Sequence, residues 1–197
     1  MLKEIVVASN NQGKVKEIDS LLNNLNIKVV SLKDVFDKEV AIEETGSTFE
    51  ENAIIKAEAV SRMVHKIVIA DDSGLEIDAL NKEPGVQSAR YLGYDTPYTI
   101  KNSYLLELLK GQTQRSARYV CAMALAIPNQ KTIVFKETME GEIAYTPAGE
   151  NGFGYDPIFY FPELAMTAAQ MTLEEKNIHS HRAKALKKVV EIIKEMK

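Results

Sequence analysis

The sequence predicts an α/β fold built around one mixed β-sheet. Short apolar runs such as EIVVA (residues 4–8) and KIVIA (66–70) alternate with stretches whose apolar residues recur at helical spacing. This succession of strands and helices is typical of an α/β fold. Further along, RYVCAMALAI and KTIVFKETMEGEIA flank the turn PNQK, and such a hairpin argues against a purely parallel sheet.

Helices are expected where apolar residues recur every three or four positions. One of them opens with the pattern Thr48-x-x-Glu51, a capping box in which two side chains satisfy backbone N–H groups at a helix start. The stretches predicted in this way are residues 15–25, 48–64 and 180–196, and residues 98–110 are also expected to be helical.

Further strands are expected on either side of the segment DDSG (71–74). IKVVSL (27–32) is predicted as the second strand of the chain. DDSG is expected to end the strand at 66–70, because its polar residues and glycine interrupt the apolar run. LEIDAL (75–80) then alternates apolar and acidic residues, which indicates a separate, half-exposed strand.

Composition narrows the class of protein. The chain has 197 residues, which fits a single domain over residues 1–197. Its net charge of −4 disfavours a nucleic-acid binder that relies on general phosphate attraction. Cys121, the single cysteine, rules out an intramolecular disulfide and suits a reducing compartment. Because no apolar run approaches the length of a signal peptide or a membrane span, we expect a cytoplasmic protein without a membrane partner.

A polar segment, SNNQGK, lies between the first predicted strand and helix. Backbone N–H groups and the helix dipole favour an anion at such a position, and the lysine adds a positive charge. The segment is not a Walker A loop, which needs a second glycine and a Ser or Thr after the lysine. An ordinary polar turn remains the alternative. The candidate anion-binding residues are Ser9, Asn10, Asn11, Gln12, Gly13 and Lys14.

Acidic residues occur in two adjacent pairs, Glu43–Glu44 and Asp71–Asp72. The second pair follows a buried strand, which is where ligand sites lie in α/β sheets. Consecutive strand residues point in opposite directions, so one aspartate should face a cleft and the other should be fixed within the protein. Carboxylates from two segments suit Mg²⁺. For the glutamates, a solvated loop beside a helix start is the alternative.

The segment GENGFGYDPIF concentrates three glycines within six residues. Glycine lets a backbone fold closely around a ligand, and Phe153, Tyr155 and Asp156 stand within this flexible loop. Cations gather later, at Lys176 and in the segment HSHR (179–182). Zinc is disfavoured there, because the histidines have neither nearby cysteines nor the spacing of a zinc motif.

Six segments spread over nearly the whole chain share their order and spacing with one enzyme family. They are ASNNQGK, EETGSTFEENAIIKA, ADDSGLEIDAL, PGVQSARY, PAGENGFGYDPIF and MTLEEKNIHSHRAKAL. Together they resemble the inosine triphosphate pyrophosphatase family, the XTP/dITP diphosphatases. The chain departs from the common pattern at Asn10, where many relatives have Gly, and at His179, which we therefore leave out of the site.

The resemblance implies hydrolysis of deaminated purine nucleoside triphosphates (ITP, dITP and XTP) to the monophosphate and pyrophosphate, which cleanses the nucleotide pool. It implies an elongated mixed sheet flanked by helices, two lobes with the active-site cleft between them, Mg²⁺ dependence and a homodimer. A pyrophosphatase for other modified nucleotides and a non-hydrolysing nucleotide sensor remain as alternatives. The whole chain would form one such pyrophosphatase domain.

The resemblance also implies roles for individual residues. Lys56 and the segment Ser9–Lys14 would hold the triphosphate, and Ser73 would help to fix the substrate. Glu43 and Asp72 would bind Mg²⁺, and Asp72 would act as the catalytic residue that orients or deprotonates water. The base would stack on Phe153. The residues that would complete the base pocket or contact the polar edge of the base are Gly154, Tyr155, Asp156, Lys176, His181 and Arg182.

Overall fold

The computed structural model describes residues 4–23, 25–38 and 40–196. Its centre is a seven-stranded sheet with the order β2-β1-β3-β4-β5-β6-β7. The strands are β1 (Glu4–Val7), β2 (Lys28–Ser31), β3 (Val68–Ile77), β4 (Ser116–Ala126), β5 (Ile133–Ile143), β6 (Phe159–Phe161) and β7 (Met166–Thr167). β1 pairs in parallel with β2 and β3, whereas β6 pairs antiparallel with β5 and β7. The predicted α/β fold with a mixed sheet is confirmed.

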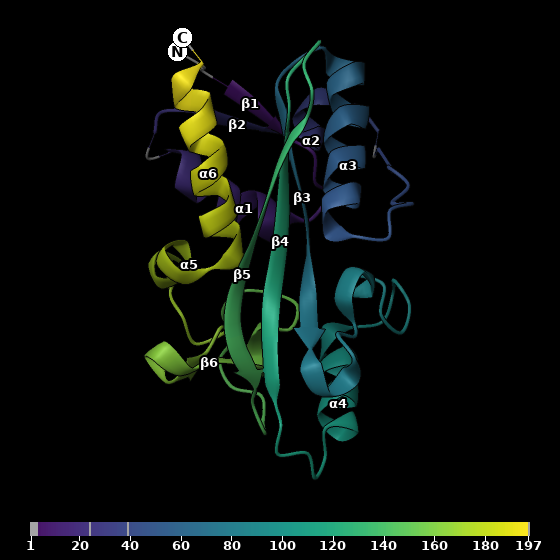
Figure 1. Cartoon of the computed structure of the whole chain (residues 1–197), viewed down its shortest axis with the longest axis vertical. Helices are drawn as coiled ribbons and strands as arrows, with labels where there is room; N and C mark the ends of the chain where they lie inside the picture. Colours follow the sequence, from purple (N-terminus) through teal and green to yellow (C-terminus); the bar gives the residue numbers. More distant parts are fainter. Residues whose placement is uncertain (1–3, 24, 39, 197) are drawn as a thin grey trace. The chain divides into compact units, whose positions relative to one another are not determined.

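Six α-helices accompany the sheet in the described ranges (Figure 1). They are α1 (Gln12–Asn23), α2 (Leu32–Val35), α3 (Phe49–Val64), α4 (Tyr98–Leu108), α5 (Leu173–His179) and α6 (His181–Glu195). Four of them match the predicted helical stretches to within three residues at either end. α3 begins as predicted, because the Thr48 side chain accepts the Glu51 N–H and the Glu51 side chain accepts the Thr48 N–H. In this part of the chain, no helix is both long enough and apolar enough to cross a membrane.

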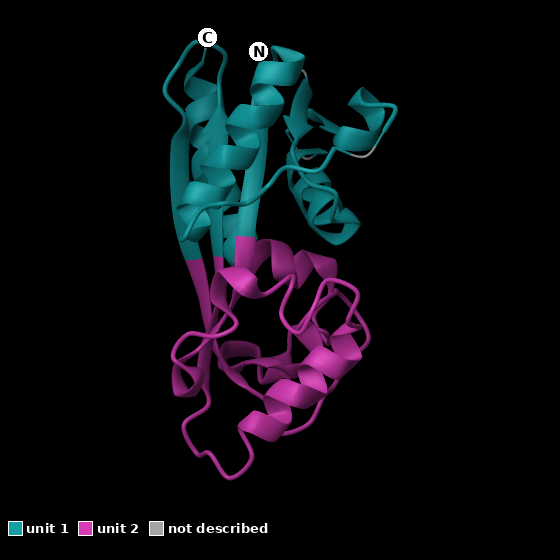
Figure 2. Cartoon of the chain, turned by 90° about the vertical axis from the view of Figure 1, so that its right-hand side faces the viewer, with its two compact units in different colours: residues 1–72, 121–137, 181–197 teal, residues 73–120, 138–180 magenta. Residues whose placement is uncertain are grey.

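The chain divides into two compact units, shown in different colours in Figure 2. Unit 1 comprises residues 1–72, 121–137 and 181–197, and unit 2 comprises residues 73–120 and 138–180. The long strands β3, β4 and β5 contribute residues to both units. The predicted cleft between two lobes, and the assignment of residues 1–197 to one domain, stay predictions.

Each unit has its own hydrophobic core. In unit 1, β1 residues such as Val7 pack with α1 through Leu22 and with α6 through Leu186, while α3 covers the opposite side of the strands (Figure 1). In unit 2, α4 packs through Leu105 against a cluster that includes Phe159 of β6. Cys121 is completely buried in the unit 1 core, and burial raises the pKa of its thiol to about 12.

The expected break at DDSG is wrong, because β3 runs from Val68 through Asp71 and Gly74 to Ile77. Gly74 serves a close approach instead of a turn. A Cβ at this position would lie 2.4 Å from the Ser88 Oγ and 2.5 Å from the Gly85 carbonyl oxygen, so only glycine fits within the strand. LEIDAL therefore continues the same strand, which ends at Ile77 where a 3₁₀ turn (Asp78–Leu80) begins.

Candidate active site

β3 presents two adjacent carboxylates to opposite faces of the sheet, as strand geometry predicts. Asp71 contacts side chains of α1 and α6, and Asp72 contacts side chains of α3. Figure 1 places α1 and α6 on one side of the strands and α3 on the other. Both aspartates are buried, with exposed fractions of 1% and 6%. The two side chains can therefore take different roles although they are neighbours in the chain.

Asp71 is fixed by two cations. The Lys14 Nζ lies 3.2 Å from its Oδ2, and the Arg182 guanidinium donates two hydrogen bonds of 3.1 and 3.2 Å to the same oxygen. Arg182 also bonds to Glu17, which is buried on α1. Burial alone would raise the pKa of Asp71, but Lys14 and Arg182 outweigh it and hold the pKa well below its ordinary value. Asp71 is thus a permanently charged anchor for Lys14.

Asp72 shares one ammonium group with a second carboxylate. The Lys56 Nζ lies 2.9 Å from the Asp72 Oδ1 and 3.0 Å from the Glu44 Oε1, and Asn52 donates to the Asp72 Oδ2 at 3.3 Å. Burial raises the pKa of Asp72, and the Glu44 charge adds to this effect, while Lys56 opposes it. A carboxylate that is more basic than usual is a better proton acceptor, which is the property that a general base requires.

These charged groups form one cluster within unit 1, which we call the acid cluster. Four carboxylates and three cations meet there. The acid cluster consists of Lys14, Glu17, Glu44, Lys56, Asp71, Asp72 and Arg182. Carboxylates and cations held side by side are an arrangement suited to a metal ion that carries a phosphate.

The carboxylates of the acid cluster suit Mg²⁺ better than a metal ion whose ligands all come from the protein. Among the residues that the structure describes, no three His, Cys, Asp or Glu side chains gather closely enough to hold a metal ion. Mg²⁺ typically uses one or two carboxylates and keeps several waters, so this donor set suits it. Glu43, the predicted second ligand, is exposed, whereas its neighbour Glu44 contacts Lys56. The role of Glu43 stays a prediction.

The predicted phosphate-binding segment forms the start of α1. The Asn11 side-chain oxygen accepts the N–H groups of Gly13 and Lys14 at 3.0 and 3.2 Å, so Asn11 caps the helix. The Ser9 hydroxyl oxygen accepts the Asn11 N–H at 3.2 Å. Gln12 is exposed, and its side chain lies 3.5 Å from the Asn10 carbonyl oxygen. These hydrogen bonds therefore fix the backbone at the start of α1, the helix that carries Lys14.

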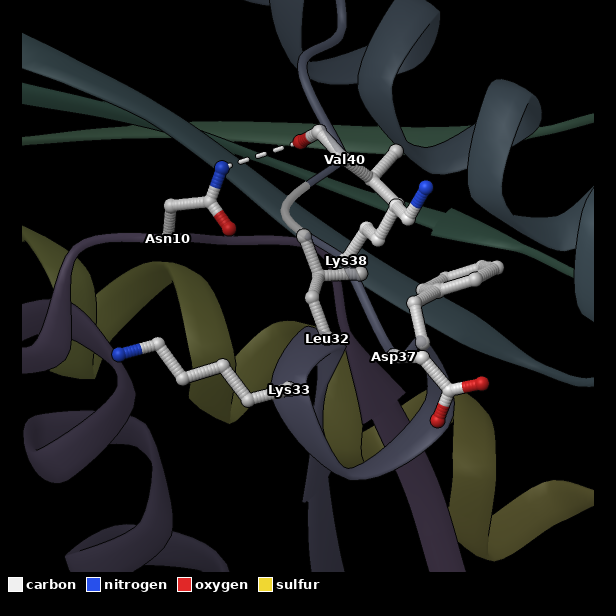
Figure 3. A pocket seen from close by; sticks show the side chains of 7 residues that line it. Asn10, Leu32, Lys33, Asp37, Lys38 and Val40 are labelled. Atoms are coloured by element: carbon white, nitrogen blue, oxygen red, sulfur yellow. Dashed lines mark hydrogen bonds between the residues drawn. The ribbon is translucent and has the colours of Figure 1, made fainter.

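Asn10 points away from this helix start. Its amide donates to the Val40 carbonyl oxygen at 3.0 Å, which ties the segment to the loop after α2 (Figure 3). A cavity of about 270 Å³ lies beside this contact. It is lined by Asn10, Leu32, Lys33, Phe36, Asp37, Lys38 and Val40. No other predicted site residue lines this cavity. The Asn10 side chain therefore lies in a different environment from the rest of the predicted phosphate-binding segment.

In unit 2, residues 149–156 form a loop whose last residue begins a 3₁₀ helix, and we call it the base loop after the base contact predicted for it. Asp156 is its centre, because its Oδ2 accepts the Phe153 N–H at 2.8 Å and the Lys176 Nζ at 2.7 Å, and its Oδ1 accepts the Tyr119 hydroxyl at 3.0 Å. The Phe153 ring is half-buried, and the Lys176 ammonium lies 5.4 Å from the ring centroid. An aromatic face and a cation are therefore held side by side.

The glycines of the base loop are required by its backbone. Gly152 and Gly154 have φ values of +73° and +69°, a region that other residues rarely adopt. A Cβ on Gly152 would also lie 2.0 Å from the Asp156 Oδ2. Tyr155 turns into the unit 2 core, where its hydroxyl donates to the Ser88 carbonyl oxygen at 2.7 Å. It anchors the loop in this structure.

The remaining predicted site residues are divided between the two units. Ser73 belongs to unit 2, and His181 and Arg182 lie buried at the start of α6 in unit 1. The hydrogen bonds of Arg182 to Asp71 and Glu17 place it in the acid cluster. Its predicted contact with the base stays a prediction, as does that of His181.

Several residues of these clusters were missed from the sequence. Asn52 stands four residues before Lys56, so both lie on one face of α3, and this spacing could have revealed it. Glu17, Tyr119 and Asn102 gave no comparable signal, because their partners Arg182, Asp156 and Gly154 lie 165, 37 and 52 residues away in the sequence.

Comparison with known proteins identifies relatives along nearly the whole chain. Residues 5–192 match the model of the Ham1 family. The chain is 52% identical over 192 residues to a dITP/XTP pyrophosphatase of Geobacillus kaustophilus, covering 96% of this chain and 94% of the relative. It is 48% identical over 195 residues to the protein of that name from an Exiguobacterium strain, covering 98% and 99%.

A solved structure shows the same fold. The Ham1 protein of Staphylococcus aureus superposes with a TM-score of 0.87 at 46% sequence identity, over 99% of this chain and all of that one. The resemblance inferred from the six sequence segments is therefore confirmed, and the chain belongs to the Ham1 family.

Proposed function

We propose that this protein hydrolyses the deaminated purine nucleoside triphosphates ITP, dITP and XTP to their monophosphates and pyrophosphate. The observation that carries the proposal is the buried Asp72, a carboxylate of raised pKa placed beside Lys56 within the acid cluster. The relatives named dITP/XTP pyrophosphatase support the choice of substrate. The reaction would remove abnormal bases from the nucleotide pool before they enter nucleic acid.

Lys14 and Lys56 would neutralise part of the triphosphate charge. Asp72 would accept a proton from a water molecule whose oxygen attacks the α-phosphorus. The bond between this phosphorus and the oxygen bridging to the β-phosphate then breaks, and pyrophosphate leaves. Mg²⁺ bound by Asp72, with Glu43 as predicted, would offset charge on the phosphoryl oxygens. Preorganised cations of this kind supply most of the catalysis in phosphoryl transfer.

The base loop would select the base. A purine stacked on Phe153 would lie close to the Lys176 ammonium, which Asp156 fixes at 2.7 Å. Hypoxanthine and xanthine carry an oxygen acceptor at C6, whereas adenine carries an amino donor there. Adenine would therefore place a donor against a donor, and a mismatch of this kind can reduce the rate by ~10⁴-fold or more. Guanine shares the C6 oxygen, so it would be rejected at its 2-amino group, by a clash or an unpaired donor.

The proposal is tested with purified protein and Mg²⁺ incubated separately with ITP, XTP, dITP, ATP and GTP. We expect pyrophosphate from the first three, little product from ATP and GTP, and loss of activity with EDTA. Orthophosphate as the product would move the cleavage to the terminal phosphate and contradict the mechanism. Binding of ITP without any product would favour a nucleotide sensor.

We also propose that the protein acts in the cytoplasm as a homodimer and without nucleic acid. The family resemblance supports the dimer, and the net charge of −4 disfavours nucleic-acid binding. Light scattering coupled to size-exclusion chromatography should give about 44 kDa, twice the 22.0 kDa of the chain. A mass of one chain would contradict the dimer but leave the proposed reaction untouched.

A further inference from the structure

Two hydrogen bonds hold the base loop on either side of Phe153. One of them comes from a residue of α4 that belongs to none of the sequence motifs. Asp156 accepts the Phe153 N–H at 2.8 Å on one side of the ring-bearing residue. On the other side, the Asn102 amide donates to the Gly154 carbonyl oxygen at 3.2 Å. The backbone around Phe153 is therefore tied both before and after its side chain.

Asn102 is an unusual residue for its position. It is 5% exposed and lies on the core-facing side of α4, near Leu105, where an apolar residue would be expected. Asparagine is a weak helix former, and a buried amide is costly unless it is hydrogen-bonded. Its Oδ1 is buried and has no hydrogen-bond partner in the described structure. The contact with Gly154 is therefore the interaction that accounts for an amide at this place.

Other contacts of α4 act on the same part of unit 2. The Tyr98 ring packs edge-on against the Tyr155 ring, with centroids 5.1 Å apart. The fully buried Lys101 donates to the Ala89 carbonyl oxygen at 2.7 Å, directly after Ser88, whose carbonyl accepts the Tyr155 hydroxyl. α4 thus contacts the base loop directly and also through the segment that holds Tyr155.

We propose that Asn102 is a positioning residue for base recognition, which acts by fixing the Gly154 carbonyl and so the orientation of Phe153. This inference rests on the proposed base pocket. Because Gly152 and Gly154 leave the loop backbone free to adopt other conformations, an external hydrogen bond is needed to select one. Preorganisation of this kind improves binding by reducing the ordering that the ligand must impose.

The test is Asn102→Leu, which keeps a side chain branched at Cγ and removes the donor. Leucine is a better helix former and removes the unpartnered Oδ1, which offsets the hydrogen bond lost at the half-buried Gly154, so the variant should stay folded. We expect the KM for ITP to rise about threefold to tenfold with kcat unchanged, which is the loss of one neutral hydrogen bond. Inhibition by inorganic tripolyphosphate, which has no base, should not change. Amide hydrogen exchange in residues 149–156 should become faster.

Ser103→Ala is the matched control, because Ser103 is exposed on the same helix and bonds only locally to the Thr99 carbonyl oxygen in the contacts seen. An unchanged KM or unchanged exchange in Asn102→Leu would overturn the proposal. So would an equal loss of tripolyphosphate inhibition, which would indicate general damage. If the wild-type protein fails to hydrolyse ITP, the proposed function fails, and the exchange measurement still decides whether Asn102 holds the loop.

Discussion

The acid cluster of unit 1 and the base loop of unit 2 position their functional groups in opposite ways. In the acid cluster, nearly every charged side chain stands on a helix or strand: Lys14 on α1, Lys56 on α3, Asp71 and Asp72 on β3, and Arg182 on α6. Opposite charges fix one another there at 2.9 to 3.2 Å. In the base loop, Phe153 stands on a loop, and side chains from regular elements hold that loop in place.

This difference matches two chemical tasks. Charge stabilisation in a reaction requires groups that do not reorganise, so rigid elements suit it. Recognition of a base requires an aromatic surface and a close backbone, which a loop with glycines provides. The comparison predicts that changes in the acid cluster affect kcat or stability, whereas changes in the base loop affect KM.

Asp72→Asn should have the largest effect on turnover. The amide cannot accept a proton from water, and general-base help is typically worth ~10²–10⁴-fold, so we expect kcat for ITP to fall at least ~10²-fold. The hydrogen bond from Lys56 to the remaining oxygen of residue 72 can persist, although the one from Asn52 is lost, so the protein should stay folded. The measurement is steady-state pyrophosphate release together with circular dichroism. Near wild-type turnover would remove Asp72 from the mechanism.

Arg182→Met should have the largest effect on stability. It removes the cation that the buried carboxylates of Asp71 and Glu17 share, and breaking a buried ion pair in this way costs ~3–5 kcal/mol. Arg62→Met is the control, because Arg62 is an exposed residue of the same unit that pairs with Glu58 at 3.8 Å. Such surface pairs contribute less than ~1 kcal/mol. Equal unfolding free energies of the two variants in urea would contradict a structural role for Arg182.

The members of the acid cluster were easier to predict from the sequence than the ion pairs between them. Asp72, Lys14 and Arg182 were predicted as site residues, because charges beside buried strands and helix starts are visible in the chain. Lys56 was predicted only from the family resemblance. That Arg182 pairs with Asp71 was not predictable, since the two are 111 residues apart and only the folded sheet brings them together. The ion pair of Glu44 with Lys56 depends on the path of one loop, which residue patterns do not specify.

For the fold too, features set by neighbouring residues were predictable and features set by distant residues were not. The predicted helices were recovered because their apolar periodicity is local. The break at DDSG was wrong, because the reason for Gly74 is the approach of Ser88, fourteen residues later in the chain. β6 and β7 are three and two residues long and were missed, since strands so short exist only through pairing with a neighbour. α5 begins with the capping box Thr172-x-x-Glu175, a pattern visible in the sequence although this helix was not predicted.

Phe153→Ala should have the smallest of these effects and sharpens the comparison most. Loss of stacking between an aromatic ring and a base costs ~1–3 kcal/mol, so we expect the KM for ITP to rise ~10-fold or more. The value of kcat and inhibition by tripolyphosphate should stay near those of the wild type, because the acid cluster is unchanged. Phe153→Tyr keeps the ring and should keep the KM. Since the Phe153 ring is only half-buried, the melting temperature should change little. If KM stayed constant while kcat fell, the base loop would share in the chemistry, and the division of tasks between the two units would be wrong.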